Sequence, residues 1–348
     1  MKQLRDLTDP WAGPHAMQLI VDKLCAIWPV PVIRDPGSVV VPVTDNYDAL
    51  RYPAGAVTRE ARYSHYLGDG MMLRSHTTAR IPALLGHLDR EAVLAVPGIC
   101  YRRDVIDRHH VGEPHQMDLW WIRPEGPEMT EEDLENMVGG VVTALLPGQP
   151  WHTSPNIHPY TLAGREIYAD GVEIGECGLA HPEVLGRHRS GLAMGLGLDR
   201  LLMLVKDVPD IRLLRSEDPR VASQMLDLEP YQPVSAQPPI RRDMSLAVAD
   251  DLDAELLGDR VRTLLGPDAE AVESVEVLSE TTYADLPTAA IERMGVQGNQ
   301  KNVLLRLVLR HPTRTLTAHD GNALRDRVYS GLHEGAAHEW ATSPCSSC

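Results

Sequence analysis

The chain has 348 residues, 43% of them hydrophobic, which is enough for one large domain and a small one. Its 33 basic and 49 acidic residues give a net charge of -16. This balance argues against binding of nucleic acid through bulk electrostatics, although it leaves room for a local basic patch. Phenylalanine is absent, whereas 10 tyrosines and 6 tryptophans are present.

The beginning of the chain and its cysteines bear on cellular location. Residues 1–6 lack both the apolar core of a signal peptide and the Arg-rich character of a transit peptide. Five cysteines are an odd and sparse number, so a reducing compartment is expected. No uninterrupted apolar run approaches the length that spans a membrane. We therefore expect a cytoplasmic protein that has no membrane partner.

The first ninety residues predict two helices and two short strands. Apolar residues near helical spacing predict a helix over 6–28, which a group of prolines ends. Residues 39–43 and 71–74 predict strands. The second strand leads into Ser75 to Thr78, whose hydroxyls suit the N-cap of a helix over 79–88.

Residues 98–122 carry the strongest chemical signal. Two apolar runs flank a charged, histidine-rich centre with Gly and Pro, which predicts two strands joined by a long exposed loop. Arg102, near the end of the first strand, has a guanidinium that can fork onto a phosphate. Gln116 and Asp118 recur at strand spacing and so face the same side. Together these side chains could hold a polyanion and an ammonium group in one cleft.

The middle of the chain predicts a helix, a hairpin and a glycine-rich strand. Thr130 begins an amphipathic helix over 131–146, with acidic residues in its first turn. Residues 165–175 predict a hairpin of two strands. The glycine-rich run 191–198 predicts a strand entering a helix over 201–205, and tight packing alone would explain its glycines.

A proline-rich stretch without periodicity, residues 225–239, predicts a linker before an independent unit. That unit predicts the order strand, helix, strand, strand, helix, with room for a final strand, as in a split βαβ, ferredoxin-like fold. The strands are expected at 241–248, 272–281 and 301–309, and the helices at 252–265 and 319–333. The domains are then 1–228, a linker 229–238, a second domain 239–341 and a tail 342–348.

Residues 98–118, 191–200 and 73–78 together resemble a known family. They are similar, in order, to motif 2, motif 3 and the Leu-Arg-x-His-Thr-Ser segment of class II aminoacyl-tRNA synthetases, in the form found in phenylalanyl-tRNA synthetase. Residues 239–245 and 314–317 resemble that enzyme's ferredoxin-fold anticodon-binding domain. The resemblance implies an α+β fold, with an antiparallel class II sheet, flanking helices and a ferredoxin-like C-terminal domain. It also implies the short single-chain type and a monomer.

The resemblance further implies a reaction and its cofactors. ATP and Mg²⁺ would activate phenylalanine or a close aromatic analogue, and tRNA, held through the C-terminal domain, would accept it. Arg102 would contact the α-phosphate and the substrate carboxylate, and Arg200 the γ-phosphate. His110 is a further candidate at ATP, and Glu173 at ATP and Mg²⁺.

The amino acid site implied by the resemblance departs from the family. Its members here are His76, Thr78, Gln116, Asp118, His158, Tyr160, Glu176 and Ala193. The family usually has Glu where Asp118 stands, phenylalanines where His158 and Tyr160 stand, and Gly where Glu176 stands, whereas Ala193 keeps the small residue at the far end of the ring pocket. Each polar group facing an apolar ring would cost roughly 1–3 kcal/mol if unpaired. Either these groups hydrogen-bond one another, or the substrate brings a partner.

Several hypotheses remain open at this stage. The first is a phenylalanyl-tRNA synthetase with a modified pocket, as an analogue-tolerant second copy whose lack of Phe keeps it intact when phenylalanine is scarce. The second is an adenylating ligase with another amino acid or a non-tRNA acceptor, and the third is a non-catalytic RNA-binding relative. Smaller alternatives are a metal site at His109, His110 and His115, and metal or redox chemistry at Cys345 and Cys348.

Overall fold

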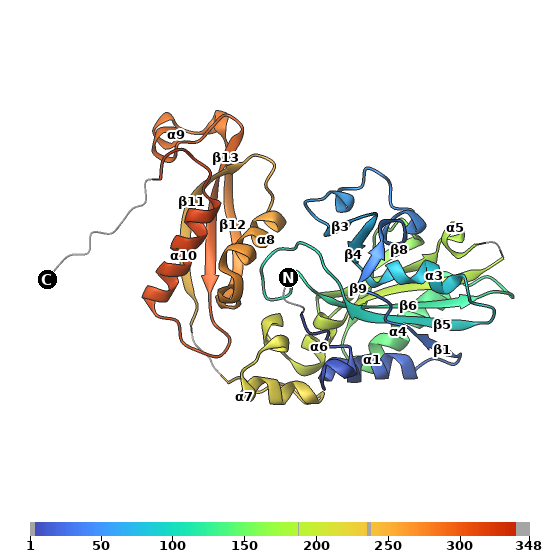
Figure 1. Cartoon of the computed structure of the whole chain (residues 1–348). Helices are drawn as coiled ribbons and strands as arrows, with labels where there is room; N and C mark the ends of the chain where they lie inside the picture. Colours follow the sequence, from blue (N-terminus) through green and yellow to red (C-terminus); the bar gives the residue numbers. More distant parts are fainter. Residues whose placement is uncertain (1–3, 187, 235–237, 339–348) are drawn as a thin grey trace. The chain divides into compact units, whose positions relative to one another are not determined.

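The computed structural model describes residues 4–186, 188–234 and 238–338 (Figure 1). Contacts divide the chain into two units: a first unit, Met1–Arg102 with Gly112–Gln232, and a second unit, Arg103–Val111 with Pro233–Cys348. Within the described ranges, no helix combines the length and the apolar character needed to cross a membrane. The predicted tail 342–348, with its two cysteines, lies outside the described residues.

A seven-stranded sheet forms the centre of the first unit. Its strand order is β1-β5-β6-β10-β9-β8-β7, with β1 parallel to β5 and all other neighbours antiparallel. The strands are β1 Val32–Arg34, β5 Ala92–Ile99, β6 His115–Arg123, β7 Trp151–Pro155, β8 Thr161–Ala169, β9 Val172–Ala180 and β10 Ser190–Gly197. The predicted α+β class with a large antiparallel sheet is confirmed. Strand β7 was not predicted, because its sequence Trp-His-Thr-Ser-Pro is mostly polar and it lies at an edge of the sheet.

Three helices pack together along one face of this sheet (Figure 1). They are α1 Ala16–Ala26, α4 Glu131–Leu145 and α6 Leu198–Lys206. Helix α4 begins as predicted, with a capping box in which Thr130 and Asp133 satisfy each other's backbone N–H. Helix α1 is shorter than the predicted 6–28, because prolines break its first part and His15 provides the N-cap.

The opposite face of the sheet is covered by short elements from the N-terminal part of the chain. They are the small sheet β2 Val40–Pro42, β4 Met71–Leu73 and β3 Tyr66–Gly68, the 3-10 helix η4 Thr77–Arg80, and α3 Ile81–Leu85. The helix predicted at 79–88 is thus split between η4 and α3 and ends earlier. Helix η4 packs on β5 and β6, and Trp120 of β6 is fully buried with Ile81 and Leu85 of α3 in one apolar cluster. This face carries the site described below.

Glycine is required at one point where these layers meet. Gly98, at the end of β5, has a φ of +150°, and a Cβ built on it would lie 2.0 Å from Nη2 of Arg74. Arg74 is 1% exposed, and its guanidinium donates to the carbonyls of Ile99 and Pro36. The glycine thus leaves room for a buried arginine that ties β5 to the segment before β2.

The start of the predicted linker is fastened to the first unit. Lys206, at the end of α6, is fully buried, and its Nζ donates to the carbonyls of Asp227 and Glu229 and to a carboxylate oxygen of Asp227. The backbone N–H of Tyr231 donates back to the carbonyl of Lys206 at 2.7 Å. The segment up to Tyr231 is therefore bonded to α6.

The second unit has a three-stranded antiparallel sheet in the order β11-β13-β12. Its elements are β11 Ile240–Ala249, α8 Ala254–Leu265, β12 Val272–Thr282, α9 Thr288–Met294, β13 Gln300–Leu309 and α10 Ala318–Leu332. The predicted strands and helices are present, and α9 is an addition. A further strand is absent among the residues described here up to 338, so the ferredoxin-like fold remains a prediction.

Candidate active site

Two carboxylates stand on the same face of the central sheet, on either side of a glycine. Asp118 of β6 lies opposite Gly195 of β10, which in turn lies opposite Glu176 of β9. Residues opposite each other in antiparallel strands point to the same face, and two strand spacings separate their backbones by about 10 Å. We call these three residues the carboxylate row. Because Gly195 has no side chain, nothing at that position covers the backbone between the two acids.

Asp118 is fixed by three donors. The hydroxyls of Thr77 and Thr78 donate to its Oδ2 at 2.6 and 3.1 Å, and Nε1 of Trp120 donates to its Oδ1 at 3.0 Å. The residue is 2% exposed. Burial raises the pKa of Asp118 to about 6, although these hydrogen bonds oppose the change. The sequence indicated Thr78 and Asp118, and the structure brings them into direct contact.

Glu176 is bound by His158 and Tyr160. The Tyr160 hydroxyl donates to its Oε1, and Nε2 of His158 lies 3.0 Å from its Oε2. Burial would raise the pKa of Glu176, but His158 and Tyr160 outweigh it and hold the pKa below its ordinary value. Burial would likewise lower the pKa of His158, yet Glu176 raises it. The polar groups predicted here therefore pair with one another, as an ion pair and a hydrogen bond.

Aromatic rings surround the row. Tyr160 stacks on Trp120 with ring centroids 5.9 Å apart, and on His158 at the same distance. Tyr52 stacks on His76 at 5.6 Å and lies 6.3 Å from Tyr160. Ala193 of β10 pairs with Trp120 and is 1% exposed, so the small residue lies on this face beside the rings.

The ring of His76 lies on this face, where the backbone of Asn46 is a hydrogen-bond partner of the ring. Both of its ring nitrogens are buried, and within the described part of the chain neither makes a side-chain hydrogen bond of good geometry. Burial lowers the pKa of His76 to about 4, so the ring is neutral at pH 7 and offers one donor and one acceptor. After burial, the charge of Glu176 raises this pKa and that of Arg102 lowers it.

The arginine predicted at the far end of the nucleotide lies one step along the sheet from the row. Gln116 pairs with Gly197, and a Cβ built on Gly197 would lie 4.0 Å from Cδ of Arg200. Nη1 of Arg200 donates to the carbonyl and to Oε2 of Glu173, both at 3.0 Å. The half-exposed Gln116 thus lies between Asp118 and Arg200 along this face.

A buried charge network, which the sequence did not reveal, ties the helix of Arg200 to the sheet. Asp199 accepts from the backbone N–H of His115, the first residue of β6, and lies 3.1 Å from Nη2 of Arg215. Burial alone would raise the pKa of Asp199, but Arg215 and His115 lower it to about 2. His115 is fully buried and takes part in this network, which ties Asp199, the residue before Arg200 in α6, to the start of β6.

Comparison with known proteins agrees with this geometry. Residues 32–225, more than half of the chain, match the family model described as tRNA synthetases class II core domain (F). The chain belongs to the class II tRNA synthetases. The chloroplastic/mitochondrial phenylalanine–tRNA ligase of Arabidopsis thaliana is 30% identical, over 84% of this chain and 68% of the relative. The Drosophila melanogaster probable mitochondrial enzyme is 28% identical, over 86% and 76%, and the Mus musculus mitochondrial enzyme 28%, over 85% and 72%.

These relatives place the synthetase in the phenylalanine–tRNA ligase family, of the single-chain type, and thus among the ligases. They also correct one prediction. The expected cytoplasmic location is wrong, because the relatives that match most of the chain are named as chloroplastic or mitochondrial enzymes. Cysteine number and the first residues were weak grounds for a location, since neither reports a compartment directly.

Two predicted site residues, His110 and Arg102, are not members of the carboxylate row. His110 bonds through Nδ1 to both carboxylate oxygens of Asp107, each at 2.8 Å, in the loop that belongs to the second unit. Arg102 lies three residues beyond β5, at the end of the first segment of the first unit, and its backbone N–H donates to the carbonyl of Gly112. The roles predicted for Arg102 and His110 at ATP therefore stay predictions.

The described residues offer little for a metal. No group of three histidine, cysteine or acidic side chains that could hold an ion occurs among them, which leaves the alternative of a histidine metal site without support in that part of the chain. Glu173 supplies one carboxylate, and its Oε2 already faces Arg200. A single carboxylate suits Mg²⁺ that keeps most of its ligands on nucleotide phosphates.

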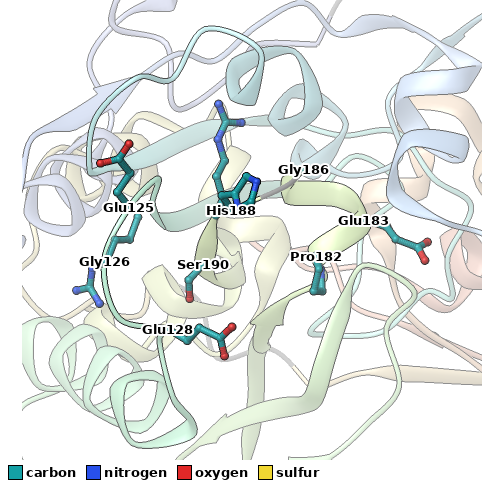
Figure 2. Close-up of a pocket in the computed structure, with 10 residues that line it drawn as sticks. Glu125, Gly126, Glu128, Pro182, Glu183, Gly186, His188 and Ser190 are labelled. Atoms are coloured by element: carbon teal, nitrogen blue, oxygen red, sulfur yellow. The ribbon is translucent and has the colours of Figure 1, made fainter.

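A separate pocket of about 880 Å³ lies elsewhere on the first unit (Figure 2). In Figure 2, Glu125 and Glu128 lie on the left of the view and Glu183 lies on the right. None of the predicted site residues is among the described side chains that line it. The chemistry therefore points to the carboxylate row and not to this pocket.

Sequence reasoning missed four residues of the site, namely Thr77, Trp120, Tyr52 and Gly195. Strand spacing from Asp118 would have found Trp120, which follows at i+2 on the same face. The others depend on long-range packing: Gly195 on the strand order, and Tyr52 on the fold of a segment far from the sheet in sequence.

Proposed function

We propose that this chain activates an aromatic amino acid with ATP and transfers it to tRNA. The observation that carries the proposal is the placement of Asp118, fixed by three donors, on the same face as Gln116, which lies between it and Arg200. An ammonium group would bind at Asp118, while the nucleotide would extend toward Arg200. Membership in the phenylalanine–tRNA ligase family supports the same assignment.

In the first step, an oxygen of the amino acid carboxylate attacks the α-phosphorus of ATP, and pyrophosphate leaves. Both reactants are anions, so the protein must align them and offset growing negative charge. Arg102 and Arg200 supply forked, permanent positive charges for this purpose. Mg²⁺ would neutralise phosphate charge, and Glu173 is the residue that would contact it.

In the second step, a terminal ribose hydroxyl of tRNA attacks the carbonyl carbon of the adenylate, and AMP leaves. The family assignment supports tRNA as acceptor. The two alternatives, an adenylating ligase with another acceptor and a non-catalytic RNA-binding relative, are not favoured by relatives that are all named phenylalanine–tRNA ligase.

ATP–pyrophosphate exchange with each standard amino acid, followed by aminoacylation of total tRNA, tests the proposal. Exchange with an aromatic amino acid and charging of tRNA would support it. Exchange without charging would favour a different acceptor, and no exchange would favour the binding-only relative. Arg200→Ala serves as the inactive control, and light scattering in the same samples checks the predicted monomer.

A further inference from the structure

The site contains one more carboxylate than the proposed reaction needs. A zwitterionic amino acid brings a single ammonium group, for which the buried Asp118 is placed. Glu176, the other end of the carboxylate row, is less buried, with 39% of its side chain exposed. It is therefore the accessible acid of the two.

The surroundings of Glu176 hold it in a defined place. Tyr160 binds one oxygen, and His158 lies 3.0 Å from the other. Tyr160 is itself clamped between the rings of Trp120 and His158. A Cβ built on Gly195 would lie 3.5 Å from Cγ and 3.7 Å from Oε1 of Glu176, so the carboxylate leans over the glycine, toward Asp118.

Glu176 retains hydrogen-bonding capacity. Each oxygen of an ionised carboxylate accepts two hydrogen bonds, so Glu176 can take a further donor beside Tyr160 and His158. His158 is 8% exposed and is engaged with Glu176, since its Nε2 lies 3.0 Å from Oε2. An accessible acceptor thus lies beside the bare backbone of Gly195.

We propose that Glu176, positioned by Tyr160 and His158, is a specificity-determining residue that selects an aromatic amino acid with a hydrogen-bond donor on its ring. The inference rests on the proposed function, and it names the substrate class. With the ammonium group at Asp118 and the ring extending over Gly195, a ring hydroxyl reaches Glu176 at the other end of the row. An unsubstituted ring would displace water from the carboxylate without replacing its hydrogen bond, which disfavours phenylalanine itself.

The test is ATP–pyrophosphate exchange with phenylalanine, meta-hydroxyphenylalanine and tyrosine. We expect kcat/KM for a hydroxylated substrate to exceed that for phenylalanine by roughly 10- to 100-fold, the range of one charge-assisted hydrogen bond. Glu176→Gly should lose this preference and gain activity with phenylalanine, and Glu176→Gln should weaken it. Glu132→Gln, the same charge change at an exposed position of α4, should leave the preference unchanged.

Thermal shifts provide a readout that is independent of turnover. The hydroxylated substrate should raise the melting temperature of the wild type more than phenylalanine does, and this difference should vanish in Glu176→Gln. If wild type and Glu176→Gln both use phenylalanine best and by the same ratio, the inference is overturned while the proposed function stands. If no amino acid supports exchange, the proposed function fails and the inference fails with it. Should Glu176→Gly not fold, the Gln variant alone decides the outcome.

Discussion

The buried charge of Asp118 should lower the free energy of unfolding of the substrate-free protein, and binding of the substrate ammonium group should offset this loss. Its pKa is raised from 3.8 to about 6, a change of about 2 units, or about 3 kcal/mol. An unfolded carboxyl titrates near 3.8, so from about pH 4 to about pH 6 the folded protein holds the extra proton, and its stability falls as pH rises. Above this range the full cost is present. Asp118→Asn keeps the shape and removes the charge, so it should remove this cost.

Urea unfolding at pH 5 and pH 7.5 measures the effect. The free energy of unfolding of Asp118→Asn, relative to that of wild type, should rise by about 1.4 kcal/mol between pH 5 and pH 7.5 because of this pKa change. An asparagine can accept from Trp120 and donate to the hydroxyls of Thr77 and Thr78, so it leaves no group unpaired. Glu132→Gln is the charge-matched control and should show no such pH dependence.

The same variant should lose substrate binding. Loss of one charge-assisted hydrogen bond to the ammonium group predicts a KM for the amino acid raised roughly 10- to 100-fold, with KM for ATP little changed. We therefore expect Asp118→Asn to be more stable than wild type at pH 7.5 and yet to bind the amino acid more weakly. If the pH dependence of Asp118→Asn equals that of wild type, Asp118 titrates normally and the reasoning is refuted; if KM is unchanged, the ammonium group binds elsewhere.

Three further changes test other parts of the first unit. Gly195→Ala should fold normally, because its Cβ meets Glu176 only at ordinary contact distance, yet it should raise KM for the amino acid several-fold; unchanged KM would show that the substrate does not cross the glycine. Arg200→Ala should lower exchange by roughly 10²- to 10³-fold and change unfolding free energy by less than about 1 kcal/mol, since its partner Glu173 is half-exposed. Lys206→Met should speed proteolysis within residues 227–231, because three oxygens there lose their donor; an unaltered cleavage rate in limited digestion with a protease of broad specificity would contradict this anchoring role.

Local pattern was sufficient for most elements and insufficient for their ends. The glycine-rich strand β10 entering α6, the helix α4 and the hairpin β8 with β9 follow from spacing and capping residues. Strand β7 escaped prediction because an edge strand needs no apolar face. Helix α1 was predicted too long, since an apolar period continued across prolines that the folded chain uses in a separate 3-10 turn.

Some residues of the site could likewise be predicted from local spacing, whereas others depend on contacts between distant segments. Asp118 and Gln116 could be chosen from strand spacing, but the pairing of Asp118 with Thr77 requires knowing that η4 packs on β6. The opposition of Asp118, Gly195 and Glu176 depends on strand order, because β10 lies between β6 and β9 although it follows both in sequence. No local rule brings these three residues together.

The complete absence of phenylalanine has a partial structural account at the buried tyrosines. Tyr47 is 1% exposed, and its hydroxyl donates to the carbonyl of Thr58 at 2.7 Å and bonds Ser64, while the Arg59 guanidinium lies 5.1 Å from its ring centre. Tyr160 likewise uses its hydroxyl on Glu176. Replacing either by phenylalanine would remove one hydrogen-bond donor, at about 0.5–3 kcal/mol each. At these two positions the hydroxyl therefore favours tyrosine, whereas the absence of phenylalanine from the rest of the chain has no structural explanation.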